Sequence, residues 1–79
     1  MVTDEALTRR ARAAYLQAGG TVDPKAAFVR EHDGRRYVVL AARDTVLAVY
    51  RIRPWDNVLS RMRRPPPELR VVTADPDAN

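Results

Sequence analysis

The sequence contains no cysteine, one histidine and one serine. Without cysteine, disulfide bonds and thiolate zinc sites are excluded. His32 lies beside Asp33 at a predicted turn, where a solvated or turn-capping role is the expectation, and Ser60 has no recognisable base beside it. The carboxylates are scattered over the predicted helix and turns, and there is no glycine-rich phosphate-binding loop. These absences predict a protein that is not an enzyme and that has neither a metal site nor a cofactor.

Long apolar runs are also absent. No apolar stretch approaches the roughly 20 residues that a membrane-spanning helix needs. The first ten residues, MVTDEALTRR, are acidic and then basic, without the apolar core of a secretory signal. We therefore expect a cytoplasmic protein with no membrane partner.

The chain is short and basic. Its 79 residues make at most one domain, and 46% of them are hydrophobic, as in globular proteins. A domain of this size buries only roughly 60% of the surface of its unfolded chain, so we expect a free energy of unfolding of about 5 kcal/mol. The net charge is +4, and Lys25 is the only lysine among 14 basic residues. The arginine excess fits a GC-rich genome as well as recognition of phosphates, carboxylates or bases.

Residues 4–18, DEALTRRARAAYLQA, are predicted to form a helix. Thr3 is the expected N-cap, acidic residues occupy the first turn, and Gly19-Gly20 stop the helix. One face carries apolar residues at helical spacing, namely Leu7, Ala11, Ala14, Tyr15 and Ala18. This stripe is narrow and rich in alanine, so the helix needs a sheet to pack on.

Three antiparallel strands are predicted after the helix. The first covers approximately residues 26–32, and RRYVVLAARDTVLAVYRIR (35–53) forms two more around a turn at Arg43-Asp44. Asp33-Gly34 is a strong hairpin signal, because glycine tolerates the positive φ of a type I′ turn. The register then pairs Phe28 with Val39 and, across the second turn, Tyr37 with Tyr50. Residues 58–64, VLSRMRR, can form a fourth strand or a short helix, and we favour the strand.

The prolines at 65–67 end the regular structure. Residues 1–64 are thus predicted to be a single small α+β domain, with one N-terminal helix packed on a three- or four-stranded antiparallel β-meander. Residues 65–79 are expected to be a Pro-rich extended segment followed by a frayed acidic tail.

The two faces of this predicted sheet differ in chemistry, because side chains alternate along a strand. The aliphatic face, where the helix should pack, receives Ala27, Val29, Val38, Leu40, Leu47 and Val49, with a charge ladder of Glu31, Arg36 and Arg51 at its edge. The other face receives Phe28, Tyr37, Val39, Ala48 and Tyr50 with Arg30 and Arg35 at one end. A fourth strand would add Arg61 and Arg63 to this second face.

Three different occupants could cover the aromatic and arginine face. The first is the C-terminal part of the chain, with Trp55 and the Pro-rich segment folding back. The second is another copy of the chain, which would make a homodimer with a sheet-on-sheet core. The third is nucleic acid, whose bases stack on aromatic rings while arginines bind phosphates.

Two resemblances are limited to topology and composition. The order helix, three strands and a possible second helix resembles the double-stranded-RNA-binding domain, but the corresponding region WDNVLSRMRRPPP is too short and ends in prolines. The strands rich in valine, arginine and tyrosine resemble the sheets of small ribonuclease toxins, which usually place two helices before the sheet. This chain has room for one helix there, and no residue role is carried over from either family.

The sequence therefore predicts a small non-enzymatic accessory protein. We expect it to bind nucleic acid, with a protein partner or a homodimer as the alternative use of the same face. The predicted binding residues are Phe28, Arg30, Arg35, Tyr37, Tyr50, Arg61 and Arg63. Loss of binding at high salt would favour nucleic acid, whereas a dry protein interface would tolerate salt.

Overall fold

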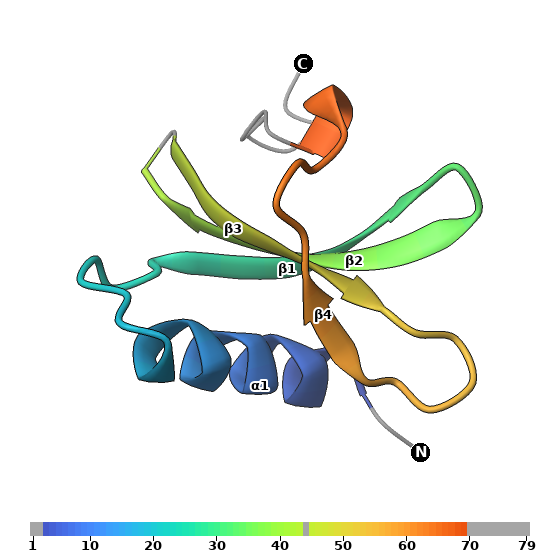
Figure 1. Ribbon diagram of the computed structural model, residues 1–79, viewed down its shortest axis with the longest axis horizontal. Coiled ribbons are helices and arrows are strands. Elements are labelled where there is room, and N and C mark those ends of the chain that lie inside the picture. The colour runs from blue at the N-terminus through green and yellow to red at the C-terminus, as the bar shows by residue number, and fades with distance from the viewer. Residues whose placement is uncertain (1–2, 44, 70–79) are drawn as a thin grey trace.

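The fold is one helix on a four-stranded antiparallel meander (Figure 1). The computed structural model describes residues 3–43 and 45–69. Its elements are α1 (Asp4–Gln17), β1 (Ala26–His32), β2 (Arg35–Ala42), β3 (Thr45–Ile52), β4 (Leu59–Arg61) and a short 3-10 helix, η1 (Pro67–Leu69). The strands follow one another in the order β1-β2-β3-β4, so each pairs with its neighbour in sequence. The predicted α+β class and meander are confirmed.

Helix α1 begins and ends where the sequence indicated. The Thr3 hydroxyl accepts a hydrogen bond from the Ala6 amide at 3.1 Å, which satisfies one of the first amides of the helix. Gly19 follows the C-cap with a φ of 95°, a conformation that glycine adopts without steric cost. At the first turn, the Asp4 carboxylate accepts a hydrogen bond from Arg36 of β2, which ties the helix to the sheet.

The first hairpin has the predicted register. His32 pairs with Arg35, Arg30 with Tyr37 and Phe28 with Val39. Asp33 and Gly34 form the turn with φ values of 55° and 77°, as a type I′ turn requires.

The second hairpin departs from the predicted register at a β-bulge. Ala42 pairs with Thr45 and Ala41 with Val46, but Leu40 then pairs with Ala48, so Leu47 is an extra residue in β3. Every later pair is shifted by one residue: Tyr37 lies opposite Arg51, and Val38 opposite Tyr50. The predicted pairing of Tyr37 with Tyr50 is wrong.

The bulge reverses the faces of β3 beyond Leu47. Tyr50 and Ile52 belong to the core under α1, whereas Val49 belongs to the opposite face. Arg51 also leaves the predicted charge ladder, because its partner Tyr37 lies on the face away from the helix. From here on, that face is called the distal face, and the one under α1 is called the helix face.

Residues 59–61 form a strand, as we favoured. Leu59 pairs with Ile52 and Arg61 with Tyr50, so β4 completes the meander. A strand at this position removes the topological resemblance to the double-stranded-RNA-binding domain, which has a helix there.

The main core lies between α1 and the helix face. Leu7, Ala11 and Tyr15 of α1 are buried, and they pack on Val38, Leu40, Ala48, Tyr50 and Ile52. The helix stripe predicted from spacing is therefore the face that packs on the sheet.

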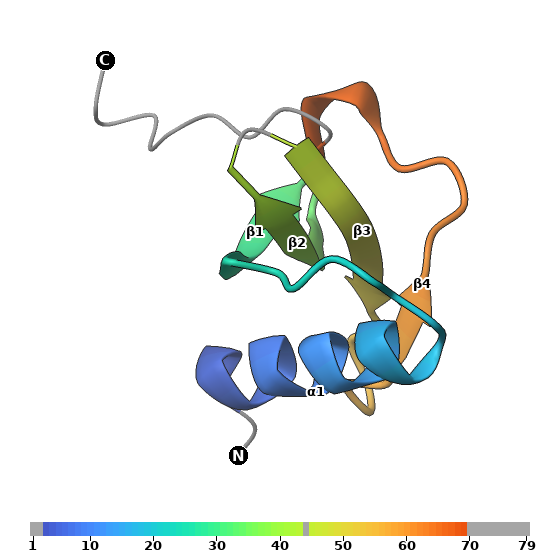
Figure 2. The same cartoon turned by 90° about the vertical axis from the view of Figure 1, so that its left-hand side faces the viewer.

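A second, smaller core covers half of the distal face. Tyr37, Val39 and Val49 are buried there together with Leu69 of η1, and Phe28, Val46 and Met62 pack around them. After β4 the chain crosses to the side of the sheet opposite α1 (Figure 2). The C-terminal segment thus folds back on the sheet as in the first of the three alternatives, but Trp55, which that alternative included, is exposed. The acidic tail beyond residue 69 lies outside the described residues.

In the described part of the chain, no helix combines the length and the apolar character that a bilayer crossing requires.

Candidate nucleic-acid interface

Four of the seven predicted binding residues lie on the distal face, as expected. Phe28 and Arg30 come from β1, and Arg35 and Tyr37 come from β2. The Arg30 guanidinium stacks on the Phe28 ring, with 5.5 Å between its carbon and the ring centroid. It also donates a hydrogen bond of 3.4 Å to the Glu68 carbonyl. This arginine therefore helps to hold the C-terminal segment on the sheet.

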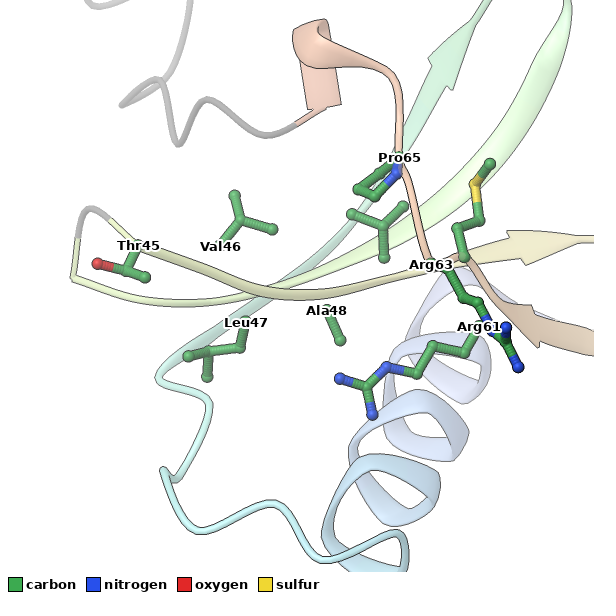
Figure 3. Close-up of a pocket in the computed structure, with 9 residues that line it drawn as sticks. Thr45, Val46, Leu47, Ala48, Arg61, Arg63 and Pro65 are labelled. Atoms are coloured by element: carbon green, nitrogen blue, oxygen red, sulfur yellow. The ribbon is translucent and has the colours of Figure 1, made fainter.

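The other three predicted residues lie elsewhere. Tyr50 is on the helix face because of the bulge, and its strand partner Arg61 is there with it. The Arg61 guanidinium stacks on Tyr15 of α1 at 5.5 Å from the ring centroid. Arg63 lines a pocket at the edge of β3, on the α1 side of the sheet (Figure 3). The predicted placement of Arg61 and Arg63 on the distal face is wrong, because it depended on the unbulged register.

The tyrosines form no open stacking platform. Tyr37 is 3% exposed and Tyr50 is 4% exposed. Burial raises the pKa of the Tyr50 hydroxyl, although the nearby Arg61 charge acts in the opposite direction. A nucleic-acid base can therefore reach neither ring without displacing the packing above it.

The uncovered half of the distal face is basic. A row of paired residues crosses all four strands at the border between this half and the small core, from Arg30 through Tyr37, which is buried, and Arg51 to Ser60. Arg35 lies two pairs closer to the turn, opposite His32. The His32 ring lies 3.7 Å from a Glu68 carboxylate oxygen, so η1 marks the border of this basic half.

The loop from Arg53 to Val58 displays the most exposed aromatic ring of the described residues. Trp55 is 75% exposed, whereas Tyr15, Tyr37 and Tyr50 are buried. This Trp55 loop joins β3 to β4 at the same end of the sheet as the β1–β2 turn (Figure 1). The sequence interpretation missed Trp55 as a binding residue, since a tryptophan in a 79-residue chain is expected to fold into the core. The turn predicted at PWDN was the only feature of the sequence that could have indicated an exposed tryptophan.

The Trp55 loop is braced by its own hydrogen bonds. Arg53 and Asp56 form a bidentate pair, with Arg53 Nε to Asp56 Oδ1 at 2.9 Å and Arg53 Nη2 to Asp56 Oδ2 at 2.6 Å. The amide of Val58 donates to the Asp56 carboxylate at 3.1 Å, and the amide of Asn57 donates to the Arg53 carbonyl at 2.8 Å. The hydrogen bonds from Arg53 hold the pKa of the Asp56 carboxyl below its usual value, and Asp56 raises the pKa of Arg53.

Asp56→Asn should loosen the Trp55 loop without unfolding the protein. The change removes the charge that pairs with Arg53, while the two residues remain at the exposed end of the sheet. We expect lower steady-state fluorescence anisotropy of Trp55 and a small change in thermal midpoint. The Asp56 pKa is lowered in the folded state, so its contribution is present at neutral pH and is lost as the pH falls below the usual pKa of the group. Unchanged anisotropy at neutral pH would show that the pair does not brace the loop.

Two pockets lie beside the Trp55 loop. One, of about 280 Å³, is lined by Arg51, Arg53, Trp55 and Ser60. The other, of about 410 Å³, lies between the loop and the β1–β2 turn and is lined by Glu31, Gly34, Arg35, Arg36, Arg51, Ile52, Pro54 and Asn57. Arg51 belongs to both, so the two pockets form one basic surface next to the indole. The guanidinium of Arg53 stacks on that indole at 5.4 Å from the ring centroid.

Comparison with protein-family models, with curated proteins and with solved structures gives no match for this chain. Among residues 3–43 and 45–69, no three acidic or histidine side chains are grouped as metal ligands would be. The geometry of the basic half of the distal face and of the Trp55 loop is therefore the basis for a functional proposal.

Proposed function

We propose that the protein is a non-enzymatic binding protein for single-stranded nucleic acid. The observation that carries the proposal is the exposure of Trp55 in a braced loop beside several arginines. Stacking of a base on an aromatic ring contributes about 1–3 kcal/mol, and every base offers a ring face for it. Arginines alongside can bind the phosphates that flank the stacked base.

Each residue of the surface has a distinct role in this proposal. Trp55 stacks on a base, and Arg53 orients the indole through their ring contact. Arg35 and Arg51 bind phosphate, since both are arginines of the uncovered half and Arg51 lines both pockets. The surface keeps a positive charge: it has five arginines, Arg30, Arg35, Arg36, Arg51 and Arg53, against the carboxylates of Glu31, Asp56 and Glu68 and that of Asp4, which pairs with Arg36.

Trp55 is the only tryptophan, so its fluorescence reports on its own site. We expect addition of oligothymidylate or oligouridylate to quench the emission, because a stacked base removes the indole from water. Trp55→Ala should lower the affinity roughly 5- to 150-fold, the equivalent of 1–3 kcal/mol, in anisotropy titrations of a labelled oligonucleotide. Equal affinity of the Trp55→Ala variant and the wild type would overturn the assignment of the stacking residue.

The arginine roles are tested by a double variant with a matched control. Arg35→Ala with Arg51→Ala should weaken binding and reduce its dependence on salt, by about 0.7 in the slope of log affinity against log salt for each lost phosphate contact. Arg10→Ala is the control, because Arg10 is an exposed arginine of α1, on the other side of the sheet. An equal effect of Arg10→Ala would mean that only the net charge matters and that no site exists.

The alternative is a protein interface at the same surface. Tryptophan and arginine are both enriched at the energetic centres of such interfaces, and the exposed Trp55 beside Arg53 has that composition. A protein interface through Trp55 would bury the indole and resist salt. Loss of nucleic-acid binding at moderate salt, with an unchanged molecular mass in light scattering, would support nucleic acid over this alternative.

A further inference from the structure

The edge of β3 is only half covered. Strand β4 pairs with Tyr50–Ile52, and the last hydrogen bond of the ladder runs from the Met62 amide to the Val49 carbonyl at 2.9 Å. Within the described residues, no strand lies beside Thr45–Ala48 on the side opposite β2. The reason is in the sequence: prolines follow at 65–67, and proline has no amide hydrogen with which to continue a ladder.

Backbone groups of β3 point to this open edge. The Ala41 carbonyl accepts a hydrogen bond from Lys25 on the β1 side, so the backbone groups of Ala42 point toward β3. Thr45 is the partner of Ala42, so the backbone N–H and C=O of Thr45 point to β2. Backbone groups alternate along a strand, and the N–H and C=O of the next residue, Val46, therefore point to the open edge. A donor and an acceptor are thus presented to an incoming strand.

A pocket of about 480 Å³ lies along this edge. Its lining consists of Thr45, Val46, Leu47, Ala48, Val49, Arg61, Met62, Arg63 and Pro65. Figure 3 shows Val46 and Pro65 on one side of β3, and Leu47, Ala48, Arg61 and Arg63 on the side that faces α1. Among the described residues of the lining, the charged ones are Arg61 and Arg63. The pocket therefore combines an open strand edge, aliphatic side chains on both faces and positive charge.

We propose that the open edge of β3 binds an extended acidic segment of a partner protein as an added strand. Main-chain hydrogen bonds to the edge would supply affinity, and alternate side chains of the segment would meet the aliphatic residues and the arginines. Carboxylates of the segment would pair with Arg61 and Arg63. The site is separate from the Trp55 loop, so this proposal does not depend on the proposed nucleic-acid function.

The charges and the bulge disfavour other occupants of this edge. A second copy paired edge to edge would bring a second Arg61 and Arg63 to the same groove, and like charges at such short range repel. A nucleic acid would leave the backbone donor and acceptor unused, and the described lining residues offer it no aromatic ring. The bulge at Leu47 twists the strand, which is a common protection against unselective edge pairing.

The test uses the full-length, isotope-labelled protein and a capped synthetic peptide of alternating valine and glutamate. We expect NMR shift changes of backbone amides confined to 45–49 and 61–63. Val46→Pro removes the edge-facing amide hydrogen and should weaken binding at least tenfold. Arg61→Gln with Arg63→Gln leaves the backbone of the edge unchanged and should weaken binding several-fold, mainly at low salt.

Two matched peptides decide the chemistry of the occupant. A peptide with lysine in place of glutamate tests charge, and one with proline in place of valine keeps the charge but cannot form a strand. Binding of either one as tightly as the valine–glutamate peptide would overturn the proposal. Two NMR results would also overturn the proposal. Shift changes at 45–49 that depend on protein concentration alone would assign the edge to a second copy. Shift changes there on addition of oligothymidylate, but not of the peptide, would assign it to nucleic acid.

Discussion

Leu7→Ala is expected to unfold the domain or bring it close to unfolding. Leu7 is fully buried and is the only large aliphatic residue of α1 in the core, where Ala11 and Tyr15 are its buried neighbours. Replacing a buried leucine by alanine costs about 2–5 kcal/mol, and a domain of this size has only about 5 kcal/mol of stability. Urea denaturation followed by circular dichroism should show a midpoint shifted far toward zero denaturant, or no folded baseline.

Leu16→Ala is the matched control for this change. It removes the same atoms from the same helix, but Leu16 is 49% exposed. Alanine has the higher helix propensity, so neither variant weakens the helix itself. We expect a change below about 1 kcal/mol for Leu16→Ala. Similar losses for the two variants would show that α1 does not dock through Leu7.

Leu69→Ala should undock the C-terminal segment and lower the free energy of unfolding by about 2–4 kcal/mol. Leu69 is 2% exposed and closes the small core that contains Tyr37, Val39 and Val49. Without it, these side chains and Phe28 would meet water, and exposed apolar surface of this kind promotes association. The measurement is urea denaturation together with light scattering at low and high salt.

The light-scattering result separates two uses of the distal face. We expect the wild type to have the mass of one chain, since Leu69 covers the apolar half, and the Leu69→Ala variant to self-associate in a salt-resistant way. Val58→Ala, at a residue that is 45% exposed, is the control for loss of aliphatic atoms in the C-terminal third of the chain. A salt-resistant dimer of the wild type would mean that the distal face is a self-interface, against the proposed function.

The local signals of the sequence were sufficient for most of the fold. The Thr3 cap, the glycines after α1 and the apolar spacing of Leu7, Ala11 and Tyr15 predicted the helix and the face that packs. Asp33-Gly34 predicted the first hairpin in its observed register. Such signals depend on a few neighbouring residues, so the helix and the hairpin can be predicted without knowledge of the rest of the structure.

The register of β3 was not predictable in the same way. Residues 46–50, VLAVY, are apolar at every position, so alternation does not say which side chain belongs to which face. Packing made the choice: the bulge at Leu47 allows Ala48, Tyr50 and Ile52 to face α1 while Val49 joins the distal core. That single extra residue also moved Arg61 away from the predicted site and brought Arg51 onto the distal face.

The candidate site, like the fold, was predictable from the sequence only in part. The sequence by itself determined that the protein has a small α+β fold with an arginine excess and an aromatic and basic distal face, because composition and short-range geometry carry that information. Only the tertiary structure decided which residues of that face reach solvent. Leu69 is close to Tyr37 in space but distant from it in sequence, and it helps to bury that ring, whereas Tyr50 is buried under α1 and Trp55 stays exposed. Burial depends on contacts between distant segments, which no local pattern records.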